Sequence, residues 1–267
     1  MVFELPLGLM LLALPGLLLV TVCAWIYSLY QEDVSIVDAA WPVMHLVAIS
    51  TYIVTSNIDS PVALGLLLMV SVWAVRLAWY LVVRSRHQPE ERRYRRLRNR
   101  HSNFEFKSLY LVFMFHGAFV WMISSGFAVV AQATSVQWTS LHSLAVLLWL
   151  FGLVFETVAD HQLHRFNQLV LRDRQTLNTG LWRFCRHPNY FGEFCIWWAW
   201  FIYAIPTNNA AILLAPVLMS ILLFKVSGIV RMEREIFQRR ADYGAYKAST
   251  SCFLPWMPRE KVRDSLN

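Results

Sequence analysis

The densest group of residues able to do chemistry is the stretch CRHPNYFGEF at 185–194, which lies between apolar segments. Arg186 and His187 can bind a phosphate or carboxylate, because both side chains offer N–H donors. Asn189 and Glu193 are four residues apart, so on a helix their amide and carboxylate share one face. The proline before them suits the first turn of a helix. The stretch therefore predicts a helix entry whose loop binds an anion and whose first turns present hydrogen-bonding groups.

Two further ionisable residues lie within apolar runs, where each costs about 2.5–3.5 kcal/mol in a bilayer and indicates a functional site. Asp38 can cap the helix that it starts, or it can point inward, because Ser35 is an equally good cap. Arg76 is about 12 Å from Arg84 along a helix, since each residue rises 1.5 Å. That depth favours an internal carboxylate or phosphate partner over a snorkelling side chain.

Glu156 and Asp160 also lie within an apolar run, and their spacing of four residues points both carboxylates the same way. Two carboxylates this close repel each other in lipid, so they need hydrogen-bond donors or cations between them. Termination of the helix explains Asp160 better than it explains Glu156.

The elements that must position these residues are membrane helices. The chain has 267 residues, of which 57% are hydrophobic and 15% charged. Its apolar runs approach or exceed the ~20 residues that a spanning helix needs. The first run lacks a basic start and a small-residue cleavage site, so it is a retained span and not a signal peptide. We expect an all-α integral membrane protein, one membrane domain over 1–267, with about seven transmembrane helices: 5–29, 36–56, 61–83, 108–133, 140–160, 190–206 and 209–230.

The basic residues predict the orientation of these spans. Nine of the 24 Lys and Arg fall in 84–107, five in 161–189 and eight in the tail 231–267, which are on one side if there are seven spans. The opposite connections near 57–60, 134–139 and 206–209 carry none. The positive-inside rule then places the N-terminus outside and the tail in the cytoplasm. In the tail we expect an amphipathic helix from Arg231 to about Lys247.

Charge and motifs exclude several classes of protein. The net charge of +7 marks the cytoplasmic face, which also contacts anionic membrane lipids, and no nucleic-acid partner is expected. The four cysteines show neither metal-binding spacing nor a reason for a disulfide on the cytoplasmic side, so we expect no metal. The chain also lacks the glycine-rich dinucleotide fingerprint, the P-loop, the zincin helix motif, the serine-hydrolase elbow and CxxC.

The ionisable residues in the apolar runs lie in the cytoplasmic half of the predicted spans, beside the arginine-rich segments. This placement predicts a pocket open to the cytoplasm for an anionic ligand with an aromatic ring. Its phosphates would bind arginines and its rings would stack on Trp and Tyr. A dinucleotide fits this description.

The runs TGLWRFCRHPNYFGEFCIWW (179–198) and ADYGAYKASTSCFLPW (241–256) resemble the carboxy-terminal region of the steroid 5-alpha-reductase superfamily. SIVDAAWP and RSRHQPEERRYRRLR resemble its bacterial multi-span branch, so the resemblance covers most of the chain. It implies a seven-helix membrane fold, in the bacterial inner membrane, that binds NADPH from the cytoplasm. Such enzymes reduce a carbon–carbon double bond conjugated to a ketone in a lipophilic substrate.

The resemblance also implies roles for single residues. Asn189 and Glu193 match an element that contacts the nicotinamide end of NADPH. Asp160 matches an aspartate that holds the adenosine part, and Arg76 matches an arginine near the phosphates. Asp38 falls near a carboxyl group that, when protonated, donates a hydrogen bond to the substrate ketone. The expected cofactor-binding residues are Arg76, Arg84, Asp160, Arg186, His187, Asn189 and Glu193.

The chain departs from the steroid enzymes at three places. Val37-Asp38 stands where they have Gln-Glu, Trp73 falls on or near their catalytic tyrosine, and Glu156 replaces an asparagine. The expected acid is Asp38, which burial would have to keep protonated, or Tyr190, whose phenol is already protonated at pH 7.

RHPNYFG also resembles the RHPxYxG element of integral-membrane methyltransferases that modify isoprenylcysteine or phospholipid amines with S-adenosylmethionine. Their second cofactor element is an acidic, arginine-containing segment, which 232–246 (MEREIFQRRADYGAY) could imitate. A third interpretation is non-catalytic, a lipid-binding or transporter-like protein.

Overall fold

The computed structural model describes residues 1–56, 60–86, 88–169, 175–226 and 229–259. Within these ranges the chain forms helices, turns and loops, and its one β-type pairing is an isolated bridge between Val2 and Asn209. The prediction of an all-α protein is confirmed for this part of the chain. Five helical segments are long and apolar enough to cross a membrane, which indicates a membrane protein: Leu7–Gln31, Ile36–Ser56, Pro61–Ser85, Phe104–Gln132 and Ser140–Asn167.

The other two predicted spans, 190–206 and 209–230, correspond to shorter elements. Helix α10 (Pro188–Ala204) has 17 residues. The apolar stretch Ala210–Lys225 contains a 3₁₀ turn, the helix α11 (Leu214–Ile221) and a π-helical turn. Seven spans and their orientation stay predictions.

The chain divides into two compact units. Unit 1 comprises Met1–Val146 and Trp200–Ala215, and unit 2 comprises Leu147–Ala199 and the chain from Pro216 onward. The expectation of one membrane domain over 1–267 likewise stays a prediction.

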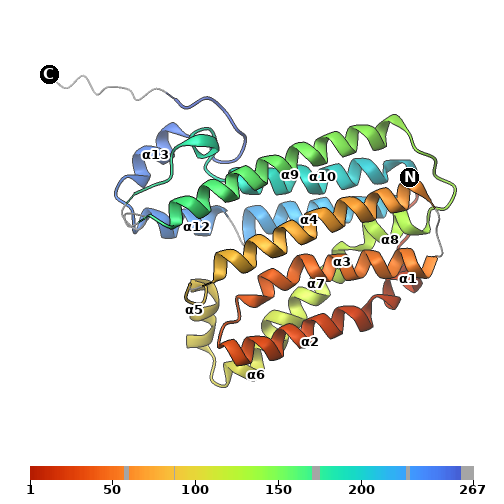
Figure 1. Ribbon diagram of the computed structural model, residues 1–267, viewed down its shortest axis with the longest axis horizontal. Helices are drawn as coiled ribbons and strands as arrows, with labels where there is room; N and C mark the ends of the chain where they lie inside the picture. Colours follow the sequence, from red (N-terminus) through yellow and green to blue (C-terminus); the bar gives the residue numbers. More distant parts are fainter. Residues whose placement is uncertain (57–59, 87, 170–174, 227–228, 260–267) are drawn as a thin grey trace. The chain divides into compact units, whose positions relative to one another are not determined.

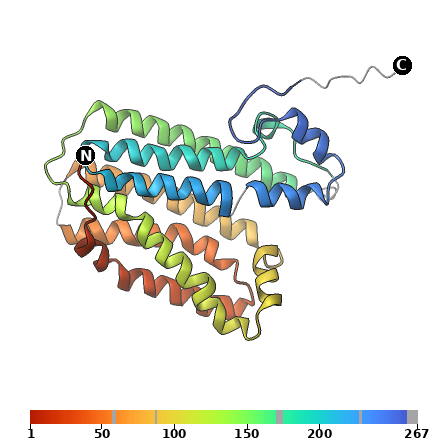
Figure 2. The same ribbon diagram turned by 180° about the vertical axis from the view of Figure 1, so that it is seen from behind.

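Unit 1 is built around α3, which packs against α2 and α4 (Figure 1). The first part of the segment from α6 to α8 lies against α2, and its last part lies against α3 and α1 (Figure 2). The elements of unit 1 before α9 (Ser140–Asn167) are α1 (Leu7–Leu12), α2 (Leu14–Gln31), α3 (Ile36–Ser56), α4 (Pro61–Ser85), α5 (Arg92–Arg100), α6 (Phe104–Ser108), the π turn η1 (Leu109–Met114), α7 (Phe115–Ile123) and α8 (Ser125–Gln132). The 3₁₀ turns η3 (Ile205–Thr207) and η4 (Ala210–Leu213) also belong to it.

Local sequence signals set the helix ends. Helix α4 has Pro61 in its first turn, and the hydroxyl of Ser60 accepts a hydrogen bond from the Ala63 N–H at 3.4 Å. A proline there loses no helical hydrogen bond, because that N–H would have no partner within the helix. Helix α2 ends at Gln31, and the next residue, Glu32, has a left-handed φ of 53°.

The core of unit 1 is aromatic. The Trp73 ring is fully buried and makes edge-to-face contacts with Trp200 at 5.2 Å and with His45 at 5.6 Å between ring centroids. Such contacts contribute about 0.5–1.5 kcal/mol each beyond the buried area. Trp73 is therefore a packing residue of this core.

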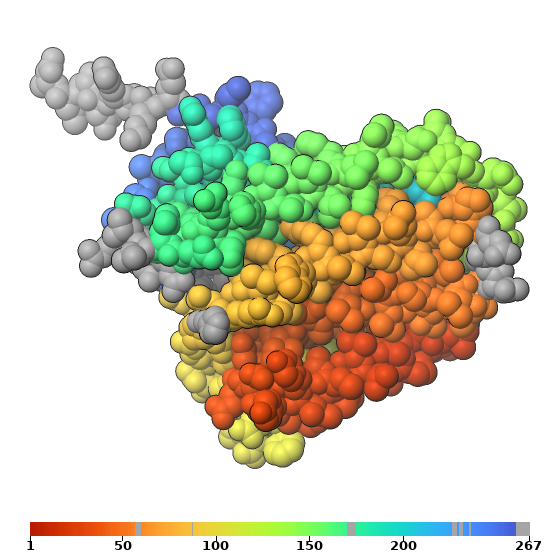
Figure 3. Space-filling view, in the orientation of Figure 1, coloured from red at the N-terminus to blue at the C-terminus, as the bar shows by residue number. Residues whose placement is uncertain are grey.

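Apolar side chains also point outward along one side of the long helices. On α4, Leu68, Val75 and Trp79 are 63–67% exposed, and they are spaced by seven and four residues. The side chains of α4 reach the surface along most of that helix (Figure 3). On α9 (Ser140–Asn167), Leu147 and Val154 are also exposed. An apolar stripe of this kind suits contact with lipid and not with water.

Unit 2 differs from the predicted helices at two places. Helix α9 continues to Asn167, seven residues beyond the predicted end at Asp160. The tail forms two helices, α12 (Ile229–Phe237) and α13 (Tyr243–Ser249), where one was expected. The turn between them is bound to a distant part of unit 2. There the Asp242 carboxylate accepts hydrogen bonds from the Thr176 N–H at 2.8 Å and from the Thr176 hydroxyl at 2.6 Å. The remaining elements are η2 (Gly180–Arg183) and η5 (Leu222–Val226).

Candidate functional site

Two glycines bring α9 and α10 into close contact in unit 2. A Cβ atom on Gly192 would lie 2.8 Å from the Gly152 carbonyl oxygen and 2.7 Å from the Glu156 backbone nitrogen. Only hydrogen fits at this position, since real Cβ atoms do not approach other atoms below about 3 Å. This contact places the carboxylates of α9 against the first turns of α10.

We call Glu156, Asp160, Asn189 and Glu193 the α9/α10 polar cluster. Its three carboxylate residues are only 3–8% exposed. The Asn189 amide donates a hydrogen bond to Asp160 at 3.3 Å, and the Trp197 indole N–H donates to Glu193 at 2.9 Å. The structure therefore brings together Asp160, Asn189 and Glu193, three of the predicted cofactor-binding residues, and Asn189 supplies a donor for the Asp160 carboxylate.

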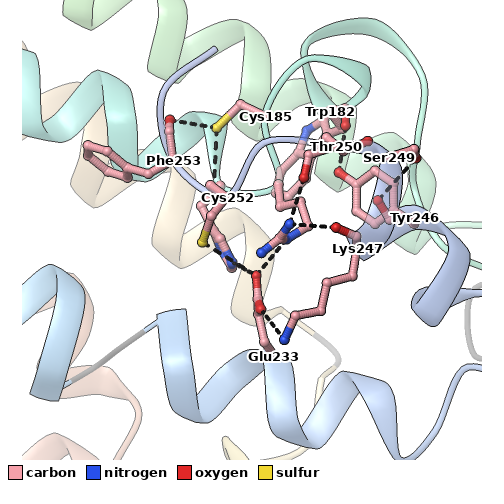
Figure 4. A network of polar contacts seen from close by, with 11 residues as sticks. Trp182, Cys185, Glu233, Tyr246, Lys247, Ser249, Thr250, Cys252 and Phe253 are labelled. Carbon is pink, nitrogen blue, oxygen red and sulfur yellow. Dashed lines mark hydrogen bonds and ion pairs between the residues drawn. The ribbon is translucent and has the colours of Figure 1, made fainter. Parts of the chain in front are cut away.

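Arg186 and His187 form a second group, which we call the Glu233 cluster. The Glu233 carboxylate accepts from Arg186 Nε at 2.7 Å and lies 3.3 Å from His187 Nε2 and 3.1 Å from Lys247 Nζ. Figure 4 shows Glu233 between Lys247 and Cys252. Burial raises the pKa of Glu233, but hydrogen bonds from His187, Arg186 and Lys247 outweigh burial and hold that pKa well below its usual range.

The segment after α13 covers the residues that precede α10. Arg186 Nη1 donates to the carbonyls of Lys247 at 3.0 Å and Thr250 at 2.6 Å. The Cys185 thiol donates to the Phe253 carbonyl at 2.8 Å. Sequence reasoning placed Arg186 in a loop open to a ligand, whereas much of its guanidinium holds the chain's own C-terminal segment.

Glu233 was not among the predicted site residues. The available signal is a glutamate inside the arginine-rich segment MEREIFQRR. That segment belongs to the stretch 232–246, which could imitate the second cofactor element of the methyltransferases.

Tyr190 follows Asn189 in α10 and is half-buried. Its ring lies 5.7 Å from the His187 ring at an interplanar angle of 32°. The phenol is thus next to both clusters of unit 2 in the sequence and contacts one of them.

The other predicted site residues lie in unit 1. Asp38 forms an ion pair with Arg93 and accepts a hydrogen bond from the Tyr94 hydroxyl at 2.8 Å. The hydroxyl of Ser35, the alternative cap for α3, accepts from the Glu91 backbone N–H at 2.8 Å. Both residues therefore hold α5 against the start of α3.

Arg76 and Arg84 lie over the same aromatic ring. Their guanidinium carbons are 5.8 and 5.7 Å from the centroid of Tyr80. Arg84 also pairs with Glu91 at 2.9 Å, and Glu91 pairs with Arg93, so Arg84 joins the network that contains Asp38.

Over residues 24–250 the sequence matches the family described as "Protein of unknown function (DUF1295)". The chain belongs to the DUF1295 family. No curated protein and no solved structure matches it. The DUF1295 match includes both clusters of unit 2 apart from Cys252. The match stops at Thr250, so the rest of the segment that covers Arg186 lies outside the matched residues.

Three potential ligand atoms in this DUF1295 chain lie close together. His187, Glu233 and Cys252 place a nitrogen, an oxygen and a sulfur within 4.8 Å of one another. A divalent metal there would lie beside Arg186 and Lys247, which already balance the carboxylate, and burial raises the pKa of the Cys252 thiol. We therefore assign the group as an ion-pair cluster and propose no metal.

We expect the Cys185 thiol to resist alkylation in the folded protein. Burial raises its pKa to about 12, so the reactive thiolate hardly forms at neutral pH. Mass spectrometry after iodoacetamide treatment should show Cys185 unmodified in the native state and modified after unfolding in denaturant. Rapid native labelling would contradict the thiol's burial beneath the Phe253 carbonyl.

Proposed function

We propose that this DUF1295 protein is an NADPH-dependent membrane reductase, related to the steroid 5-alpha-reductase superfamily, that reduces the conjugated double bond of a lipophilic enone. The observation that carries the proposal is the hydrogen bond from Asn189 to Asp160 beside Glu193, in a buried cluster. We further propose seven spans in a bacterial inner membrane, with the N-terminus outside and the site open to the cytoplasm.

The α9/α10 polar cluster fits the uncharged parts of the cofactor. Three carboxylates and one amide, all within two helices, suit a ligand that offers N–H and O–H donors, such as a carboxamide and ribose hydroxyls. Asp160, Asn189 and Glu193 would hold these groups, and their burial would exclude water from them. NADPH, when bound, supplies a hydride.

Tyr190 is the proton donor that we propose for the substrate carbonyl. A phenol is protonated at neutral pH and can donate. Both carboxylate oxygens of Asp38, the other candidate, already accept a hydrogen bond, one from Arg93 and one from the Tyr94 hydroxyl. Asp38 thus serves better as an anchor for α5 than as an acid.

One observation favours a second candidate, an S-adenosylmethionine-dependent methyltransferase. Glu233 lies in the segment 232–246, which could imitate the second cofactor element of those enzymes, and it contacts Arg186 and His187 of the RHP element. These contacts bring the two methyltransferase-like elements together within unit 2.

Thermal unfolding of the purified chain with each cofactor tests the proposal. We expect NADPH, and not S-adenosylmethionine, to raise the Tm. We expect Asn189→Ala and Glu193→Gln to weaken NADPH binding by about tenfold each, because the first removes a hydrogen-bonding amide and the second replaces one acceptor oxygen with an NH2 donor. The exposed amide variant Asn99→Ala is the matched control and should bind NADPH normally.

Stabilisation by S-adenosylmethionine alone would overturn the reductase proposal in favour of the methyltransferase. A Tm unchanged by either cofactor would favour the lipid-binding interpretation.

A further inference from the structure

A cavity of about 470 Å³ lies in unit 2, between Arg186 and the segment 247–259. Among the residues that the structure describes, its lining carries three cationic side chains and no carboxylate residue. The cations are Arg186, Lys247 and Arg259. Of the three hydroxyl residues, Ser249 and Thr250 already donate to backbone carbonyls, and Ser251 is the one whose hydroxyl has no such bond among the described contacts. Hydroxyl groups beside cations suit an anionic oxygen ligand such as phosphate.

The charges near the cavity do not cancel. Glu233 supplies one negative charge between Arg186 and Lys247. Arg259 is exposed, and among the residues that the structure describes no ion pair involves its side chain. The lining therefore keeps a surplus of positive charge that attracts an anion.

Large apolar side chains share this lining and point to the outside. Leu254 is 63% exposed, and Trp256 and Met257 are each 74% exposed. The backbone that carries them is fixed, since the Trp256 N–H donates to the Phe184 carbonyl at 3.0 Å and the Arg259 N–H to the Ser249 carbonyl at 2.8 Å. The exposure is therefore built into the fold of this segment.

This fixed segment lies beside the entry of an apolar helix. It bonds to Phe184, Cys185 and Arg186, immediately before α10 begins at Pro188. Exposed tryptophan beside arginine and lysine at the end of an apolar helix is typical of the membrane–water interface.

We propose that this cavity binds the headgroup of an anionic phospholipid. Its phosphate would contact Lys247, Arg259 and the Ser251 hydroxyl, and its hydrocarbon chains would contact Leu254, Trp256 and Met257. A free phosphate would leave the exposed apolar side chains without a partner, whereas a phospholipid uses both kinds of lining.

The test measures the Tm of the detergent-purified full chain with four probes: short-chain phosphatidylglycerol, short-chain phosphatidylcholine, inorganic phosphate and NADPH. We expect phosphatidylglycerol to give the largest rise at this site and native mass spectrometry to show it retained. The proposal would be overturned if phosphatidylcholine bound equally well, or if inorganic phosphate at the same concentration reproduced the rise. Competition between NADPH and phosphatidylglycerol would overturn it too, because the cavity would then be part of the cofactor site.

Arg259 is the side chain to vary, since it has no described ion pair to lose. Arg259→Gln should weaken phosphatidylglycerol binding about fivefold, the effect of removing one cation near an anionic surface. Arg259→Lys should retain binding, and Arg100→Gln, an exposed arginine of α5 in unit 1, should leave it unchanged. Equal losses in Arg259→Gln and Arg100→Gln would show attraction by the overall charge and overturn a specific site.

Discussion

Replacing Glu233 with glutamine is expected to lower the free energy of unfolding by about 3–5 kcal/mol, the effect of removing one partner from a buried ion pair. The Arg186 and Glu233 side chains are 8% and 7% exposed, so the guanidinium would keep its charge with no carboxylate beside it. Denaturant unfolding in detergent, followed by circular dichroism, would measure the loss. Glu105→Gln removes an exposed carboxylate and is the matched control.

A double-variant cycle separates the ion pair from a general loss of packing. Arg186→Gln should also destabilise the chain, because Arg186 donates to the Lys247 and Thr250 carbonyls as well. The double variant should lose less than the sum of the two single losses, since neither charge is then left alone. Strictly additive losses would contradict a direct coupling between the two side chains.

The second large effect is expected from Gly192→Ala. The added methyl group would lie 2.6 Å from Glu156 Cβ and 2.8 Å from the Gly152 carbonyl oxygen, and backbone on α9 cannot turn aside as a flexible side chain can. Overpacking of this kind costs about 1–3 kcal/mol. Because the helices must separate, we also expect NADPH binding to weaken, if Asp160 and Asn189 hold the cofactor as proposed.

Gly244→Ala is the matched control in the same unit. Its Cβ would meet only Phe237 Cε2 at 3.5 Å, which is an ordinary contact. Helix α13 should gain up to about 1 kcal/mol from the better helix former. Equal stability of the Gly192→Ala and wild-type chains would show that α9 and α10 are not held at this distance by the glycines.

Helix positions could largely be predicted from the sequence, because apolar runs and prolines act locally. The predicted span 36–56 coincides with α3, and 61–83 differs from α4 only at its end. The prediction of one helix in the tail was wrong for a non-local reason, since Thr176 binds the turn at Asp242 from 66 residues away.

In the candidate site, too, local features could be predicted from the sequence and distant contacts could not. The i, i+4 spacing of Asn189 and Glu193 could be read from the sequence, and both lie in the α9/α10 polar cluster. Nothing in the local pattern shows that Arg186 would bind Glu233, 47 residues later, or that Asp38 would bind Arg93 of α5. Partners of buried charges depend on the packing of helices, which spacing along one helix does not determine.

The hydrogen bonds of Arg186 and Cys185 to the segment after α13 also fix an order of events during translation. Their acceptors lie 61 to 68 residues farther along the chain. At about 5–20 residues per second, ribosomes need several seconds to make that stretch. During this interval the acceptors that Arg186 and Cys185 use in the folded protein have not yet been made. A chain stalled before Lys247 should therefore be a good substrate for chaperones and membrane proteases.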